Sequence, residues 1–180
     1  IVLATGTGPV VPPIDGLAGT PYWTNREAIE ATTLPSSLVV LGGGAIGLEL
    51  AQAYARFGTQ VTVVEALDRL IATEEPEAST LARAALEADG LTIHTGARAT
   101  GVHHDGQHFA VTLENNQVVL GERVLVAVGR RAEIGPLGVE TVGLDPDARA
   151  IEVDGRMRAG ERLWAIGDVT VHGGFTHVAM

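Results

Sequence analysis

Hydrophobic positions in the first half of the chain alternate between short continuous runs and runs of helical spacing. Residues 37–41 form a short, mostly apolar stretch with β-branched side chains, which is typical of a buried parallel strand. Over residues 45–57 the apolar positions recur at helical spacing, and Gly58 supplies a helix end. A second strand-like run follows at residues 60–65. The order strand, helix, strand predicts a βαβ unit. The expected apolar face of its helix consists of Ile46, Leu50, Ala53, Tyr54 and Phe57.

The pattern then gives one more helix and parallel strand before it changes character. Pro76 opens the second helix and Asp89-Gly90 ends it. Period-two alternation with turn dipeptides next predicts three antiparallel strands, a β-meander used as a crossover. The apolar face of the second helix is expected to hold Ala78, Leu81, Ala82, Ala85 and Leu86. The other predicted elements are a short helix at 24–31, parallel strands at 91–95 and 123–128, and meander strands at 99–104, 107–113 and 117–120.

Glycines spaced G-x-G-x-x-G stand between the first strand and its helix. Gly42 allows the tight turn out of the strand, Gly44 lets a diphosphate approach the backbone, and Gly47 lets the helix pack closely on the sheet. The N–H groups and positive dipole end of the helix then face the turn and form an anion site. A glycine motif by itself is often only a turn. In register with a strand, a helix and a second strand, it predicts a dinucleotide-binding site.

An acidic residue stands at the end of the second strand. Glu65 follows the glycine motif at about the 20-residue offset at which a carboxylate accepts hydrogen bonds from the adenosine ribose. Because a carboxylate there repels a 2′-phosphate, the sequence predicts NAD as cofactor, with NADH preferred over NADPH. A solvated loop acid is the alternative reading of Glu65. Arg69 leaves NADP open, since an arginine can receive the 2′-phosphate.

Composition narrows the class of protein. The 180 residues are 46% hydrophobic and 4% aromatic, a balance that fits an α/β protein with one good core. A net charge of −10 argues against nucleic acid or an anionic membrane as a partner. With no long apolar run and no signal-like start, we expect a soluble cytoplasmic protein. The chain has no cysteine, and His103, His104 and His108 match no familiar ligand spacing, so no metal site is predicted.

Three further segments, with the glycine motif, resemble the successive landmarks of the flavoprotein disulfide reductases. Dihydrolipoamide dehydrogenase and mercuric-reductase-like proteins are nearest, and the likeness covers nearly the whole chain. It implies an α/β fold of the FAD/NAD(P)-binding type, a Rossmann-like parallel sheet with helices and a three-stranded antiparallel meander crossover. The landmarks are VLATGTGP at 2–9, LVAVGRR at 125–131 and LWAIGD at 163–168. The implied parts are a remnant of the FAD domain with a connector at 1–32, the NAD-binding domain at 33–128, and the start of the returning FAD-domain segment at 129–180.

The resemblance also implies roles for particular residues. Glu49 matches a glutamate that pairs with a lysine beside the flavin and the nicotinamide, its alternative being a first-turn acid favoured by the helix dipole. Ala45 stands where some relatives carry a larger residue that gates the nicotinamide pocket. Asp168 resembles the FAD-binding aspartate, and residues 175–178 resemble the segment near the flavin ring. The implied cofactor-binding residues are Gly42, Gly44, Ala45, Ile46, Gly47, Glu65, Gly129 and Asp168.

Other catalytic parts of that family have no counterpart in these residues, namely an FAD glycine motif, a redox-active cysteine pair and a dimerisation domain. The resemblance therefore implies a homodimeric parent that passes hydride from NADH to FAD and on to a disulfide or another acceptor. Alone, this portion is expected to be inactive, and its partners are the remainder of its own FAD and dimerisation domains. A mercuric reductase or NADH oxidase relative, and a free-standing nucleotide-binding sensor module, are the alternatives.

Overall fold

The structure is a computed structural model that describes residues 1–172. The chain forms two compact units: a larger unit, Pro9–Gly129, and a smaller unit made of Ile1–Gly8 and the chain from Arg130 onward. The first boundary between these compact units falls near residue 8, and the domain bounds expected from the sequence stay a prediction. Residues 9–32 pack with the larger unit because Leu17 is fully buried in its core.

The larger unit is built on a four-stranded sheet that is parallel throughout and has the order β5-β4-β3-β9. Side chains alternate between its two faces: Leu38 and Val40 belong to the core on the helix side, and Val39 and Leu41 to the core on the other. Burial of both faces explains the nearly continuous apolar runs in the sequence. The strands are β3 (Ser37–Leu41), β4 (Gln60–Val64), β5 (Thr92–His94) and β9 (Arg123–Val126).

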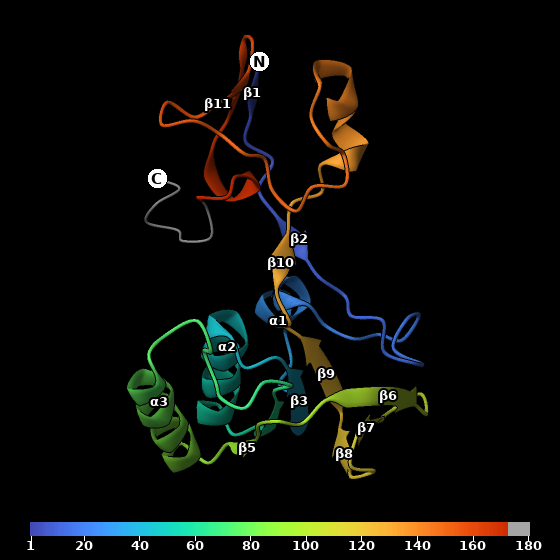
Figure 1. The fold of residues 1–180 in the computed structure, drawn as a ribbon. Coiled ribbons are helices and arrows are strands. Elements are labelled where there is room, and N and C mark those ends of the chain that lie inside the picture. The colour runs from blue at the N-terminus through green and yellow to red at the C-terminus, as the bar shows by residue number, and fades with distance from the viewer. Residues whose placement is uncertain (173–180) are drawn as a thin grey trace. The chain divides into compact units, whose positions relative to one another are not determined.

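Helices α2 (Ala45–Arg56) and α3 (Pro76–Ala88) cover one face of this sheet, and the short α1 (Asn25–Glu30) packs beside α2 (Figure 1). Gln52 and Arg56 of α2 both donate to the Asp89 carboxylate just after α3, at 2.7 and 3.1 Å. These bonds hold the pKa of Asp89 below its ordinary value, and the bond from Gln52 has the largest effect. They join the two helices at their C-terminal ends.

The predicted helices are present, but their buried faces differ from those expected. In α2 the buried residues are Gly47, Leu48, Ala51 and Tyr54, whereas Phe57 is 68% exposed. The helix is turned by about one residue because Gly47 must face the sheet. In α3 Leu86 is buried and Leu81 is 72% exposed. This helix turns Arg83 toward the edge strand β5, where the guanidinium donates to the Ile93 carbonyl at 3.2 Å.

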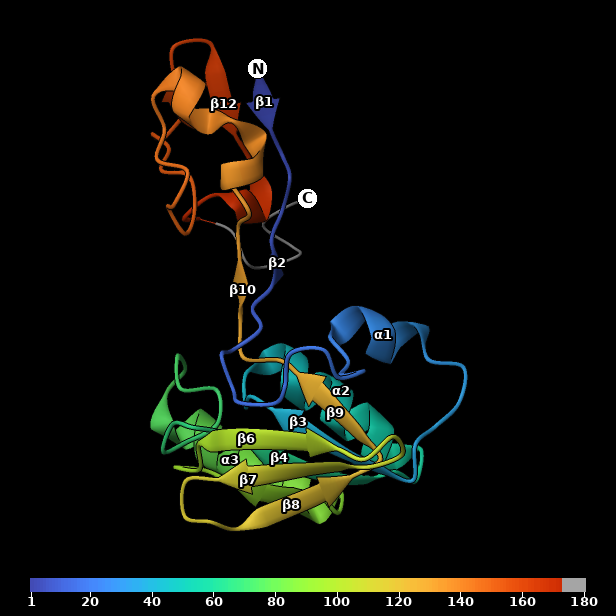
Figure 2. The same ribbon diagram turned by 90° about the vertical axis from the view of Figure 1, so that its right-hand side faces the viewer.

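The three antiparallel strands lie across the opposite face of the sheet (Figure 2). They have the order β6-β7-β8, which confirms the predicted meander. Phe109 of β7 is fully buried between the meander and the parallel sheet. The helices and the meander thus cover the two faces of the parallel sheet. The strands are β6 (Ala99–His104), β7 (Phe109–Leu113) and β8 (Val118–Gly121).

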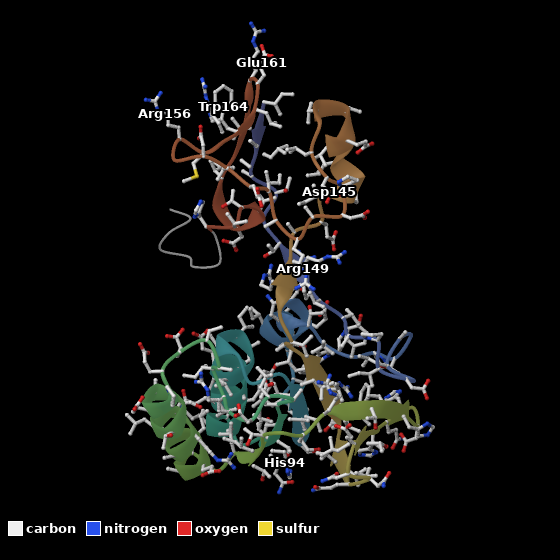
Figure 3. All side chains as sticks on the ribbon, in the orientation of Figure 1. His94, Asp145, Arg149, Arg156, Glu161 and Trp164 are labelled. Carbon is white, nitrogen blue, oxygen red and sulfur yellow. The ribbon has the colours of Figure 1, made fainter. Side chains whose placement is uncertain are left out.

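The smaller unit has its own core, whose buried members among residues 1–172 gather around Ala165 and Ile134. Its sheet has the order β1-β12-β11, and a second two-stranded pairing joins β2 to β10. Trp164 of β12, labelled in Figure 3, packs under the Arg158 guanidinium at 5.8 Å. No helix among residues 1–172 has both the length and the apolar composition that crossing a bilayer requires. The elements are β1 (Val2–Leu3), β2 (Gly8–Pro9), β10 (Arg130–Arg131), β11 (Arg158–Gly160), β12 (Leu163–Ala165) and the 3-10 helices η1 (Gly135–Leu137), η2 (Val139–Val142) and η3 (Gly167–Val169).

Candidate functional site

The carboxyl ends of the parallel strands meet at one edge of the sheet. From β3 the chain passes to β4 on one side and later reaches β9 on the other, so the strand order reverses beside β3. Open α/β sheets bind ligands at such a switch point. Gly42, Glu65 and Ala127 directly follow β3, β4 and β9. Three of the chain's turns are therefore brought together at this edge.

Two glycines of the motif occupy positions that exclude a side chain. Gly42 has φ +112°, and a Cβ added there would lie 2.4 Å from the carbonyl oxygen of Ala127. A Cβ on Gly47 would lie 2.4 Å from the Gly42 oxygen and 3.2 Å from Cβ of Ala127. The tight turn and the close helix packing expected of these glycines are thus present. Ala127 is a contributor that the sequence analysis missed, although it lies within the second landmark segment.

Gly44 is different, because it faces open space. It is exposed, and a Cβ built on it would meet no atom within 4 Å. It is the N-cap of α2, with φ −82° and ψ 174°, and no side chain caps the helix. The N–H groups of Ala45, Ile46 and Gly47 have no partner inside the helix, as in any first turn. Their positive end stands beside the open surface at Gly44, an arrangement that favours an anion.

The Glu65 side chain turns toward this glycine turn. Its Oε2 accepts from the Gly43 N–H at 2.5 Å, and its Oε1 accepts from the Leu67 N–H at 2.7 Å. A Cβ on Gly43 would lie 2.7 Å from Leu70 Cδ2 and 3.1 Å from Glu65 Cβ. The carboxylate is therefore anchored at the tip of β4 and is not a freely solvated loop acid. Gly43 was not singled out because the G-x-G-x-x-G pattern leaves its position unspecified, and Leu70 was not because the loop after Glu65 has no periodic pattern.

Arg69, the residue that kept NADP open, is engaged inside its own loop. Its guanidinium donates to the carbonyl oxygens of Ala72 and Glu74, each at 2.7 Å. These bonds engage two of the five N–H donors of the guanidinium and hold it within the loop. The loop also carries the acidic residues Asp68 and Glu74.

Glu49 lies on the exposed side of α2, one turn beyond Ala45. The first turn of the helix holds no acidic residue, so the alternative that Glu49 is a first-turn acid is wrong. Gly129 is exposed, has φ +136°, and accepts from the Val10 N–H at 2.9 Å. The cofactor contacts expected of Glu49 and Gly129 stay predictions.

The remaining residues expected to bind cofactor belong to the smaller unit. Asp168 is half-buried in the first turn of η3, and the Thr170 hydroxyl donates to the Gly167 carbonyl at 2.8 Å. The segment 175–178 lies outside the described residues. Arg130 donates to the carbonyl and the hydroxyl oxygen of Thr7, so this exposed arginine is tied to the first landmark segment.

The histidines of the β6–β7 hairpin do not gather around a common point. The His104 ring packs on Phe109 with centroids 4.3 Å apart. The Asp105 carboxylate accepts from the backbone N–H groups of His108 and Gln107, and these bonds lower its pKa from the ordinary value. Over residues 1–172, no group of three or more His, Cys, Asp or Glu side chains is placed to hold a metal ion.

The fold and the glycine turn at its switch point define a Rossmann-like α/β protein. The chain belongs to the pyridine nucleotide-disulphide oxidoreductase family, whose sequence profile matches residues 1–180. It is 40% identical over 183 residues to a mercuric reductase of Streptomyces lividans, and 37% identical over 174 residues to a dihydrolipoyl dehydrogenase of Haloferax volcanii. Its fold is similar to the HOCl-induced flavoprotein disulfide reductase RclA of Escherichia coli, solved as a Cu(II) complex, with a TM-score of 0.91 and 31% identity.

The likeness extends over almost the whole chain but over a minor part of each relative. The alignments cover 99% of this chain with the Streptomyces protein and with RclA, and 93% with the Haloferax protein. They span 38%, 42% and 37% of those three proteins, respectively. Relatives of this family are oxidoreductases that use FAD and a pyridine nucleotide. This fold class and family agree with those predicted from the sequence.

Proposed function

We propose that this chain is the NAD(H)-binding part of an FAD-dependent oxidoreductase that passes hydride from NADH to FAD and on to a disulfide or another acceptor. One observation carries the proposal: the open backbone at Gly44, before the uncapped N-terminus of α2, lies next to the anchored carboxylate of Glu65. This surface fits a diphosphate joined to a ribose. A side chain at residue 44 would fill the space that the diphosphate needs.

The preference for NADH rests on the hydrogen-bonding capacity of Glu65. An ionised carboxylate offers about four acceptor positions, of which the N–H groups of Gly43 and Leu67 occupy two. Two positions are left for the two hydroxyls of an adenosine ribose. A 2′-phosphate offers negative oxygens in place of one hydroxyl and would meet the carboxylate as a like charge. The guanidinium of Arg69 is held by two loop carbonyls and is therefore less available to a 2′-phosphate than a free arginine side chain.

The nicotinamide and the flavin supply the hydride chemistry when they are bound, and the protein binds and orients them. In this proposal Gly42, Gly44, Ala45, Ile46 and Gly47 hold the diphosphate and Glu65 the ribose. Glu49 lies on the nicotinamide side and acts in the intact enzyme, while Gly129 and Asp168 contact cofactor there. The partners are the remaining FAD and dimerisation domains of the same protein, in a cytoplasmic homodimer.

The chain alone is expected to bind NADH without turning it over. Its 180 residues contain no cysteine and a single glycine motif of this kind, so they offer no thiol relay and no second dinucleotide turn. NADH binding is measured by the change in nicotinamide fluorescence, and turnover with NADH and dichlorophenolindophenol. We expect saturable binding and no dye reduction above background. Dye reduction by the purified chain contradicts the inactive-portion proposal, and absence of NADH binding contradicts the site itself.

A further inference from the structure

The middle glycine of the turn is held through both of its backbone polar groups. The Gly43 N–H donates to Glu65 Oε2 at 2.5 Å, and the Gly43 carbonyl accepts from the Ile71 N–H at 2.8 Å. Gly43 directly precedes Gly44, where the open surface lies. The tip of β4 and the loop after it therefore fix the backbone that leads into the first turn of α2.

The loop that provides the second bond is itself tightly constrained. Ile71 has φ +38°, an uncommon conformation that is strained for a β-branched residue. Leu70, its neighbour, is buried against the turn, and Arg69 donates to two carbonyls of the same loop. Such strain persists only where surrounding contacts over-determine the conformation, and it is common at ligand clamps. These contacts converge on the Gly43 backbone.

We infer that Glu65 is a positioning residue for the diphosphate turn, in addition to its role toward the ribose. Its bond to Gly43 sets the orientation of the backbone that precedes Gly44 and the free amides of α2. This inference rests on the proposed function, because it concerns the same site. It makes a distinctive prediction: the carboxylate strengthens binding of a nucleotide diphosphate that has no ribose hydroxyls.

The sign of this effect separates it from ordinary electrostatics. Glu65 is negative and stands beside an anion site, so its charge alone opposes diphosphate binding. If the side chain acted only through its charge and the ribose hydroxyls, Glu65→Ala would leave binding of a hydroxyl-free diphosphate unchanged or tighter. A positioning role predicts weaker binding.

The test compares ADP with 2′,3′-dideoxy-ADP on the full chain by calorimetry or by NMR titration of its amides. We expect Glu65→Ala to weaken dideoxy-ADP binding by about tenfold, the order expected for losing a hydrogen bond to a charged group. The loss for ADP should be larger. Asp68→Ala is the matched control, because Asp68 is an exposed acid of the same loop. It should leave dideoxy-ADP affinity unchanged or slightly higher.

Glu65→Gln provides the rescue, since its amide oxygen can still accept from the Gly43 N–H. Its dideoxy-ADP affinity should lie within about threefold of the unmodified chain, a cost well below that of losing the bond. Equal losses in the Gln and Ala variants, or unchanged dideoxy-ADP binding in Glu65→Ala, would overturn the positioning role while leaving ADP binding and the proposed function intact. If the unmodified chain does not bind ADP, the proposed function fails first and the positioning role with it.

Discussion

Replacing Gly42 by alanine is expected to lower the free energy of unfolding of the larger unit by about 3 kcal/mol or more, the sum of backbone strain and overpacking. The strain comes from φ +112°, which alanine adopts poorly. The overpacking comes from a methyl group 2.4 Å from the Ala127 carbonyl oxygen, at a backbone fixed between β3 and β9. The atoms nearest to the added methyl group all belong to the backbone of Ala127 and Val128, so no flexible side chain can move away.

Urea unfolding measures this loss, with Trp23 fluorescence as the reporter of the larger unit. Trp23 packs against Tyr54 of α2 with ring centroids 6.0 Å apart, and Trp164→Phe removes the signal of the smaller unit. Gly44→Ala in the same background is the control, because its backbone is ordinary and its Cβ meets no atom. It should cost less than about 1 kcal/mol, the loss typical of an N-cap change. Similar midpoints for the Gly42 and Gly44 variants would show that the Gly42 contact is unimportant.

Replacing Gly44 by aspartate is expected to weaken NADH binding by at least about 100-fold while leaving the chain as stable as before or more so. Aspartate is a preferred N-cap, and its carboxylate accepts from the N–H groups of the helix start. The backbone of Gly44, φ −82° and ψ 174°, already suits that role. The same carboxylate occupies the amides proposed to hold the diphosphate and places a negative charge against it. The affinity for NADH should therefore fall while the free energy of unfolding stays the same or rises.

Two measurements on one preparation decide this prediction: NADH fluorescence titration and the Trp23 urea transition. Gly44→Ala supplies the uncharged comparison, since it adds bulk at the same place without a cap or a charge. We expect it to weaken NADH binding by less than the aspartate does. Tight NADH binding by Gly44→Asp would place the diphosphate elsewhere, even if the chain is folded.

The strands, helices and meander of the larger unit could be predicted because each has a regular pattern of apolar positions. The rotation of each helix about its own axis, which decides the residues that face the sheet, could not be predicted from this pattern. In α2 the glycine motif already placed Gly47 against the sheet, but the apolar spacing by itself pointed to a different face, because a glycine adds no hydrophobic side chain to the pattern. In α3 Arg83 reaches the sheet edge although its side chain is 40% exposed, and a pattern of apolar positions does not anticipate a charged residue there. The 3-10 helices η1 and η2 of the smaller unit also lack a recognisable pattern.

The candidate site was predictable where its chemistry depends on sequence spacing, and not where it depends on loop geometry. The glycine spacing and the terminal acid were sufficient to single out Gly42, Gly44, Gly47 and Glu65. The bond from Gly43 to Glu65 joins residues that are 22 positions apart, and it exists only because β3 and β4 are neighbours. Engagement of Arg69 by its own loop likewise depends on the path of the backbone.

Calorimetric titration of the chain with NADH and with NADPH tests most directly whether Glu65 binds the adenosine ribose beside a glycine turn that holds the diphosphate. We expect NADH to bind at least about tenfold more tightly, a difference of about 1.4 kcal/mol. Glu65→Ala should remove most of that difference. Equal affinity for the two nucleotides, or tighter binding of NADPH, would contradict the assignment of Glu65.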